Sequence, residues 1–160
     1  MSEITIRSLD AGDRSLIENI LSSDKTFGAG EVAVAFELVD DALSKPDSDY
    51  WFRVALRNGE PAGYICFGPT PMTECTYDLY WIVTHAGHRG HGVARSLIEH
   101  MEAVLRARGP KAQIRVETSQ SDGYDAARKL YQRLEYPEVA RFRNFYADTD
   151  DLIVFYKSLS

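Results

Sequence analysis

Two hydrophobic rhythms divide the sequence into strands and helices. An apolar residue at every second position, as in Ile4 to Arg7, is typical of a half-buried strand. Apolar residues three or four apart, as in Val93 to Leu105, are typical of an amphipathic helix. The expected strands are 4–7, 50–57, 61–67, 76–84, 112–118, 138–146 and 152–157. The expected helices carry residues 16–21, 32–43, 93–105 and 125–135.

Turn-forming residues separate these segments. Asn58-Gly59 fits a two-residue hairpin loop, because both positions accept positive φ, and Gly109-Pro110 ends the third helix. Thr26 to Gly30 is expected to be a flexible loop, and Asp148 to Asp151 an acidic turn between the last two strands. The order β-α-α-β-β-β-α-β-α-β-β predicts an α/β (α+β) fold, with one central mixed sheet and helices on both faces. Because no linker interrupts it, residues 1–160 are expected to form a single domain.

Composition narrows the functional classes. A net charge of −6 argues against nonspecific binding to nucleic acid and is compatible with a cationic amine substrate. Cys66 and Cys75 lack the spacing of metal ligands and are expected to be reduced thiols. We recognise neither a leader peptide nor an apolar stretch long enough to span a membrane, so we expect a cytoplasmic protein that does not bind membranes.

A glycine-containing segment, Arg89 to Ala94, lies between an expected strand and a long expected helix. This position gathers free backbone N–H groups and the positive end of a helix dipole, which together make an anion site. Gly90 and Gly92 let phosphate oxygens approach the backbone, and Arg89 and Arg95 add positive charge. The P-loop alternative lacks Gly-Lys-Ser/Thr, and the dinucleotide alternative lacks a third small residue where Arg95 stands. A further interpretation is that the two glycines only form the turn that connects the strand to the helix.

The same segment resembles the Gln/Arg-x-x-Gly-x-Gly/Ala motif of the GNAT acetyltransferase family, with matches at Arg89, Gly92 and Ala94. Residues 124–136 resemble the later family motif Asn-x-x-Ala-x-x-Leu-Tyr-x-x-Leu-Gly-Phe. Two departures are that Tyr124 replaces the asparagine that contacts the pantetheine in many members, and Glu135 replaces the helix-ending glycine. Residues 143–146, Arg-Asn-Phe-Tyr, are similar to the end of bacterial ribosomal-protein-alanine acetyltransferases.

The resemblance implies a GNAT acyltransferase domain over residues 1–160, with acetyl-CoA (coenzyme A) as co-substrate and no metal. It also implies that the backbone at the end of the fourth strand pairs with the pantetheine arm, while the glycine loop holds the phosphates. The cofactor-binding residues expected on this basis are Ile82, Val83, Thr84, Arg89, Gly90, His91, Gly92, Val93, Ala94 and Arg95.

Acyl transfer from a thioester to an amine needs a base for the amine and an acid for the departing thiolate. The resemblance assigns the acid to Tyr131, and a phenol with a pKa of about 10 is protonated at neutral pH. Without the resemblance, the apolar helical stripe favours a core residue at Tyr131 over a catalytic one. Glu117 aligns with the base of ribosomal-protein-alanine acetyltransferases, and Asp78 with the base of histone-type members. Glu117 is favoured as the base and Asp78 as an anchor for the substrate ammonium, although an ordinary strand-end charge fits each as well.

Other side chains leave alternatives open. Phe27, Tyr80 and Tyr146 are candidates to line the acceptor pocket, although aromatic residues in strands more often serve packing. The three histidines between residues 85 and 91 have a spacing compatible with a metal, but no carboxylate or cysteine is interleaved. We therefore expect these histidines to face solvent or the cofactor.

These observations predict an acyl-CoA-dependent N-acetyltransferase that moves an acetyl group to a primary amine, either a small molecule or a protein N-terminus. The alternative is a noncatalytic acyl-CoA-binding or ligand-sensing module on the same fold, favoured by Tyr124 in place of asparagine. An enzyme that uses the loop for ATP or NAD is a third interpretation. A homodimer is compatible with the sequence, because many relatives pair through terminal strands.

Overall fold

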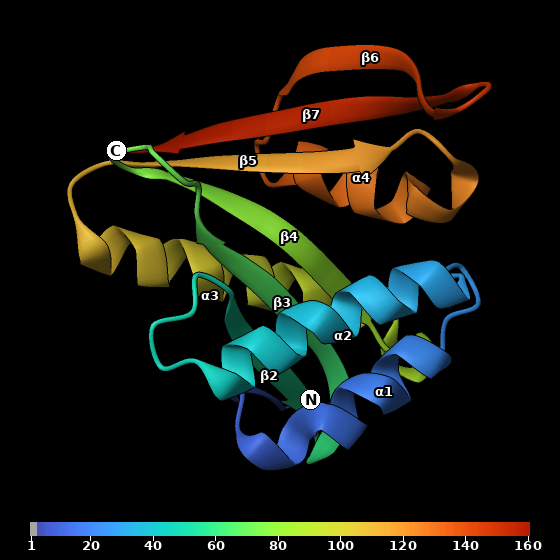
Figure 1. Cartoon of the computed structure of the whole chain (residues 1–160), viewed down its shortest axis with the longest axis vertical. Helices are drawn as coiled ribbons and strands as arrows, with labels where there is room; N and C mark the ends of the chain where they lie inside the picture. The colour runs from blue at the N-terminus through green and yellow to red at the C-terminus, as the bar shows by residue number, and fades with distance from the viewer. Residues whose placement is uncertain (1–2) are drawn as a thin grey trace. The chain divides into compact units, whose positions relative to one another are not determined.

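The computed structural model describes residues 3–160 and confirms the expected order of strands and helices. In this part of the chain, seven strands form a mixed sheet in the order β1-β2-β3-β4-β5-β7-β6 (Figure 1). The residues group into two compact units, one running up to Gly68 and including Trp81–Ala103, the other formed by Pro69–Tyr80 and Val104–Ser160. Strand β4 (Thr76–Thr84) and helix α3 (Val93–Arg108) contribute residues to both units.

The first unit is built on antiparallel strands. β1 (Ile4–Ser8) pairs with β2 (Trp51–Arg57), and β2 pairs with β3 (Glu60–Pro69). The loop between β2 and β3 is the expected hairpin turn, since Asn58 and Gly59 have φ of 53° and 82°. Both positions therefore adopt the left-handed conformation that such a turn requires.

Two helices accompany these strands. Asp10 caps a short 3-10 turn, η1 (Ala11–Asp13), and α1 (Arg14–Ser22) follows. Helix α2 (Ala29–Ser44) is joined to α1 by an ion pair between Arg14 Nε and Asp40 Oδ1 at 3.0 Å, and Figure 1 shows the two helices close together. None of the helices in residues 3–160 is both long and apolar enough to cross a membrane.

The expected loop before α2 is shorter than the sequence suggested. The Gly28 N–H donates to the Glu31 carboxylate at 3.3 Å, and the Val32 N–H donates to the Gly28 carbonyl at 3.0 Å. These bonds satisfy donors of the first helical turn, so Ala29 and Gly30 are helical. The prediction of a loop up to Gly30 was therefore wrong for its last two residues.

A close approach at Gly63 fixes where α3 begins. A Cβ at this position of β3 would lie 2.7 Å from the Val83 carbonyl oxygen and 2.9 Å from Val93 Cγ1. Only glycine permits that approach without displacing its neighbours. The first residue of α3 is thereby held against β3, next to the end of β4.

The second unit has a parallel pairing followed by antiparallel ones. Thr76–Leu79 of β4 pairs in parallel with Gln113–Val116 of β5 (Ala112–Ser119). β5 pairs antiparallel with β7, and β7 pairs antiparallel with β6. The remaining elements of this unit are η3 (Asp122–Tyr124), α4 (Asp125–Arg133), β6 (Glu138–Ala147) and β7 (Asp150–Leu159).

Two boundaries in this unit differ from the sequence expectation. Helix α4 ends at Arg133, because the Tyr136 N–H donates to the Tyr131 carbonyl at 2.9 Å and Glu135 takes a φ of 67°. Glu135 thus occupies the left-handed position that usually takes glycine at a helix end. The acidic turn is also shorter than expected, since Asp150 already belongs to β7.

Candidate active site

The glycine loop turns through two left-handed positions just before α3 begins. Gly90 and Gly92 have φ of 79° and 80°, and a Cβ built at either position would meet no described atom within 4 Å. The Ser96 N–H donates to the Gly92 carbonyl at 3.0 Å, so the first turn of α3 starts at this point. No acidic residue stands in that turn. The helix therefore presents N–H donors and its positive end without a competing carboxylate on the first turn.

Both arginines of the loop are exposed and paired with carboxylates. Arg89 Nη2 lies 2.7 Å from Asp24 Oδ2, and Arg95 Nε lies 2.9 Å from Glu99 Oε1. A guanidinium has five N–H donors, so each arginine keeps donors beyond those used here. Sequence reasoning missed Asp24, because 65 residues separate it from Arg89 and no local pattern marks it.

The end of β4 is fixed mainly by its neighbour β3. Val83 is buried, Ile82 and Thr84 are half-buried, and the His85 N–H donates to the Ala62 carbonyl at 2.8 Å. The side chains of residues 82–84 include one hydroxyl and no charge. Any polar binding by Ile82 and Val83 must therefore come from their backbone groups.

The histidines near the loop do not form a metal centre. His85 Nδ1 accepts a hydrogen bond from the Gly87 N–H at 2.9 Å and caps the 3-10 turn η2 (Ala86–His88). His88 is buried, with Nδ1 3.3 Å from Arg57 Nη1 and Nε2 3.5 Å from Glu60 Oε2. Within residues 3–160, no three His, Cys, Asp or Glu side chains lie close enough together to hold one metal ion. The expectation that these histidines face solvent or a cofactor was wrong for His88, which instead packs within the first unit.

Asp78 is held by two donors in the second unit. Arg115 Nε lies 2.7 Å from Asp78 Oδ1 and Arg115 Nη2 lies 3.2 Å from Oδ2, while the Thr70 hydroxyl donates to Oδ2 at 2.6 Å. The hydrogen bond to Asp78 raises the pKa of Arg115. Asp78 is 8% exposed, so little of its carboxylate remains open to a substrate.

Glu117 is the accessible carboxylate of the pair. Its side chain is exposed, and its Oε1 lies 3.9 Å from Arg115 Nε. Arg115, which the sequence analysis did not single out, therefore lies next to both candidate bases. Its position two residues before Glu117, on the same face of one strand, is the signal that would have indicated it.

Tyr131 is buried in the core of the second unit. Its ring centroid lies 5.4 Å from that of Phe155 and 6.2 Å from that of Tyr136. Burial raises the pKa of the Tyr131 phenol above its usual value. The hydroxyl is therefore protonated at any physiological pH, as a proton donor must be.

Glu117 and Tyr131 lie on opposite faces of the strand pair β5–β7. Val116 is the cross-strand partner of Phe155, and Phe155 contacts Tyr131, so Val116 points to the face that α4 covers. Successive side chains of a strand point to opposite faces, so Glu117 points to the other one.

The aromatic candidates fall into different units. Phe27 packs against Trp81 in the first unit, with ring centroids 5.5 Å apart. Tyr80 and Tyr146 belong to the second unit, and Tyr146 is 50% exposed. Burial, together with the charges of Glu117 and Asp150, raises the pKa of Tyr146. Tyr146 therefore lies within electrostatic reach of the exposed carboxylate.

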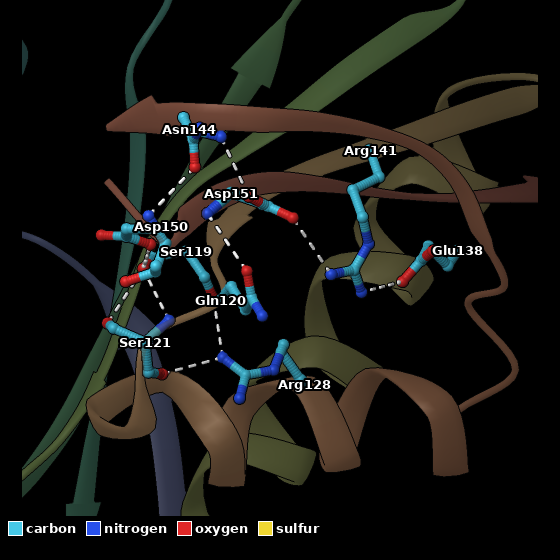
Figure 2. Close-up of polar contacts among 10 residues, drawn as sticks. Ser119, Gln120, Ser121, Arg128, Glu138, Arg141, Asn144, Asp150 and Asp151 are labelled. Carbon is cyan, nitrogen blue, oxygen red and sulfur yellow. Dashed lines mark hydrogen bonds and ion pairs between the residues drawn. The ribbon is translucent and has the colours of Figure 1, made fainter. Parts of the chain in front are cut away.

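A polar network fixes the hairpin that carries Tyr146 (Figure 2). Buried Asp151 accepts a hydrogen bond from the Asn144 N–H at 2.9 Å and lies 3.3 Å from Arg141 Nη1. Asn144 has a φ of 56°, and its side-chain oxygen accepts from the Thr149 N–H at 3.0 Å. The Ser119 hydroxyl donates to Asp150, which ties the hairpin to the end of β5. Asp151 is therefore a buried residue that holds the hairpin together, and it does not lie in a solvated turn.

Comparison with known proteins identifies the family. The sequence model of the acetyltransferase (GNAT) family matches residues 16–136. The chain belongs to the GNAT acetyltransferase family. An acetyltransferase of Pectobacterium atrosepticum is 35% identical over 94 residues, and this match covers 55% of the chain but only 58% of that relative's length.

Solved structures of GNAT proteins share the fold. A GNAT-family acetyltransferase from Desulfovibrio desulfuricans has a TM-score of 0.91 at 31% identity, and the alignment covers 99% of this chain and 100% of the other. The ribosomal-protein-S18-alanine N-acetyltransferase of Escherichia coli has a TM-score of 0.78 at 24% identity, with 99% and 95% of the chains covered. The second similarity supports the GNAT fold alone.

The GNAT family match covers some of the candidate residues and not others. It spans Phe27, the glycine loop, Glu117 and Tyr131, and it stops before Tyr146. The hairpin that carries Tyr146 therefore lies outside the segment on which the family assignment rests.

Proposed function

We propose that this chain is an acetyl-CoA-dependent N-acetyltransferase that transfers an acetyl group to a primary amine by direct attack. The observation that carries the proposal is the glycine loop at the start of α3, where two positive-φ glycines stand beside open space in a chain of the GNAT family. We also propose that the two units function together as one acyltransferase domain, since the family match extends over parts of both.

The donor is proposed to bind through its phosphates at residues 89–95. Their backbone N–H groups lie in an exposed turn at the positive end of a 16-residue helix, which favours a pyrophosphate. Arg89 and Arg95 add charge-assisted hydrogen bonds. The backbone of Ile82, Val83 and Thr84 is proposed to hold the pantetheine arm and to polarise the thioester carbonyl.

Glu117 is the proposed base. Asp78 is a weaker candidate, because Arg115 and Thr70 already occupy both of its carboxylate oxygens. Because these oxygens already accept hydrogen bonds inside the protein, little of the Asp78 carboxylate is left to contact a substrate. Glu117 is exposed and can accept a proton from the substrate ammonium, directly or through a water.

Tyr131 is the proposed acid. The neutral amine forms a bond from its nitrogen to the acetyl carbon, the carbon–sulfur bond breaks, and the thiolate takes the phenolic proton of Tyr131. The phenol then recovers a proton from solvent. Two protons leave the nitrogen: Glu117 takes the first from the ammonium and releases it to water, and it takes the second as the tetrahedral intermediate collapses to the amide, so no further reactant is required.

A protein N-terminus is the favoured acceptor class. The hairpin presents Phe142, Phe145 and Tyr146, each at least half exposed, and exposed aromatic side chains suit a peptide better than a small polar amine. The Escherichia coli protein of the same fold is described as acting on the alanine of a ribosomal protein, which makes an N-terminal alanine peptide a sensible first substrate.

The test is release of free thiol from acetyl-CoA in the presence of amines. The panel contains peptides with N-terminal alanine, serine and methionine, together with polyamines, amino acids and aminoglycosides. We expect saturable thiol release with at least one peptide, and a product heavier by one acetyl group. Binding of coenzyme A without turnover on the whole panel would instead support the noncatalytic module, in line with Tyr124 at the place of the family asparagine.

A further inference from the structure

The carboxylate of Asp24, far from the glycine loop in the sequence, contacts that loop at Arg89. Asp24 Oδ2 lies 2.7 Å from Arg89 Nη2, and the Asp24 side chain is 16% exposed whereas that of Arg89 is 55% exposed. The Thr26 N–H donates to Asp24 Oδ1 at 2.9 Å. Burial alone would raise the pKa of Asp24, but the hydrogen bonds from Thr26 and the Arg89 charge lower it. Asp24 is thus a fixed anion, and Arg89 is the exposed partner that it orients.

Two other contacts join the same segments. The Ala86 N–H donates to the Ser23 hydroxyl at 3.0 Å, and Ser23 in turn donates to the Ile20 carbonyl at the end of α1. Phe27 packs against Trp81. Residues 23–27, which we call the strap, therefore contact β4 at Trp81, η2 at Ala86 and the glycine loop at Arg89. All of these contacts lie within the first unit.

We propose that Asp24 is a positioning residue for the donor, which acts by holding the Arg89 guanidinium ready for the phosphates of coenzyme A. The inference rests on the proposed function, because it assumes that Arg89 contacts those phosphates. An exposed arginine loses side-chain entropy when it binds a ligand, and an ion pair that already restricts it lowers that loss. Because the strap carries Asp24 and also packs Phe27 on Trp81, donor binding at Arg89 is coupled to order in the strap.

The primary test is a double-mutant cycle on coenzyme A affinity, measured by calorimetry. Asp24→Asn is expected to raise the Kd by about three- to tenfold. Arg89→Met is expected to raise it as well, and adding Asp24→Asn to Arg89→Met is expected to change it no further. Asp40→Asn is the matched control, since Asp40 also pairs with an arginine, Arg14, which joins α1 to α2 in the same unit. This control is expected to leave the Kd unchanged.

Hydrogen exchange of the strap amides adds a readout that does not depend on turnover. In the parent protein, coenzyme A is expected to slow exchange of residues 23–27, and in Asp24→Asn this slowing is expected to be lost. If the parent fails to bind coenzyme A, the proposed function itself fails. If the parent binds but Asp24→Asn binds equally well, or weakens binding equally in the Arg89→Met background, only the positioning role of Asp24 is overturned. Thermal unfolding of each variant shows whether it has folded. If Asp24→Asn has not, Asp24→Ser takes its place in the cycle.

Discussion

Glu117 and Tyr131 lie on opposite faces of the strand pair β5–β7, although both belong to the second unit. In the proposed reaction Glu117 removes a proton from the acceptor and Tyr131 gives one to the departing thiolate. The two proton transfers therefore take place on different faces of the same strands.

Replacing Tyr131 by phenylalanine tests the proposed acid. Tyr131→Phe is expected to lower kcat by about a hundredfold, because it removes a positioned proton donor while keeping the ring that packs on Phe155. The affinity for coenzyme A is expected to be unchanged. Steady-state kinetics and calorimetry measure the two quantities.

Tyr64 provides the matched control for that substitution. Its hydroxyl is buried and has no hydrogen-bond partner in residues 3–160. Tyr64→Phe is expected to leave kcat unchanged and to raise the free energy of unfolding by about 1 kcal/mol, because it removes an unsatisfied polar group. Full turnover by Tyr131→Phe would remove Tyr131 from the mechanism.

Substitutions at Glu117 and at Asp78 are expected to have different effects, which distinguishes the base from the structural carboxylate. Glu117→Gln is expected to lower kcat/KM by about a hundredfold while stability is kept. Asp78→Asn is expected to lower the free energy of unfolding by about 1–2 kcal/mol, because it leaves the partly buried Arg115 without its partner. Asp78→Asn is expected to lower kcat/KM by less than Glu117→Gln does. The reverse pattern would make Asp78 the base.

Stability is expected to fall in acid through Asp13. The hydrogen bond from Arg7 lowers the pKa of Asp13, with Arg7 Nη1 2.7 Å from Oδ2 and Nη2 2.9 Å from Oδ1. A carboxylate with a lowered folded-state pKa stabilises the fold above its unfolded pKa of about 4, and this contribution is lost as the pH falls through the folded value.

Asp13→Asn measures that contribution directly. The variant is expected to be about 1–3 kcal/mol less stable than the parent at pH 6 in urea unfolding. The difference is expected to shrink progressively as the pH falls below about 4. A difference that stays constant over this range would show that the ion pair with Arg7 is not the source of the acid sensitivity.

The sequence was sufficient for features whose physical cause is local. Periodicity and turn residues predicted the strands, the helices and the hairpin at Asn58-Gly59. Features that depend on distant contacts were not predictable in the same way. Asp24 reaches Arg89 only after folding, and Asp78 is occupied only because the parallel pairing of β4 with β5 brings Arg115 opposite to it.

Local rules also failed where tertiary structure overrode them. Helix α4 ends at Arg133, although Glu135 is a residue that normally favours helix, because the chain turns through a left-handed position there to enter β6. His88 is a polar residue beside an exposed loop, yet Arg57 and Glu60 from the hairpin surround it. The family motif marks a helix end at residue 135, whereas nothing in the neighbouring sequence marks the burial of His88.

Titration of the purified chain with coenzyme A, compared with a pair of glycine variants, tests the central claim most directly. Gly92→Ala places a side chain at a φ of 80° over the proposed phosphate site, whereas Gly30→Ala lies in α2 and meets no described atom within 4 Å. We expect the parent and Gly30→Ala to bind with the same Kd, and Gly92→Ala to bind at least about tenfold more weakly. Equal binding by all three proteins, or binding of ATP or NAD with none of coenzyme A, would contradict the assignment of the loop to the acetyl donor.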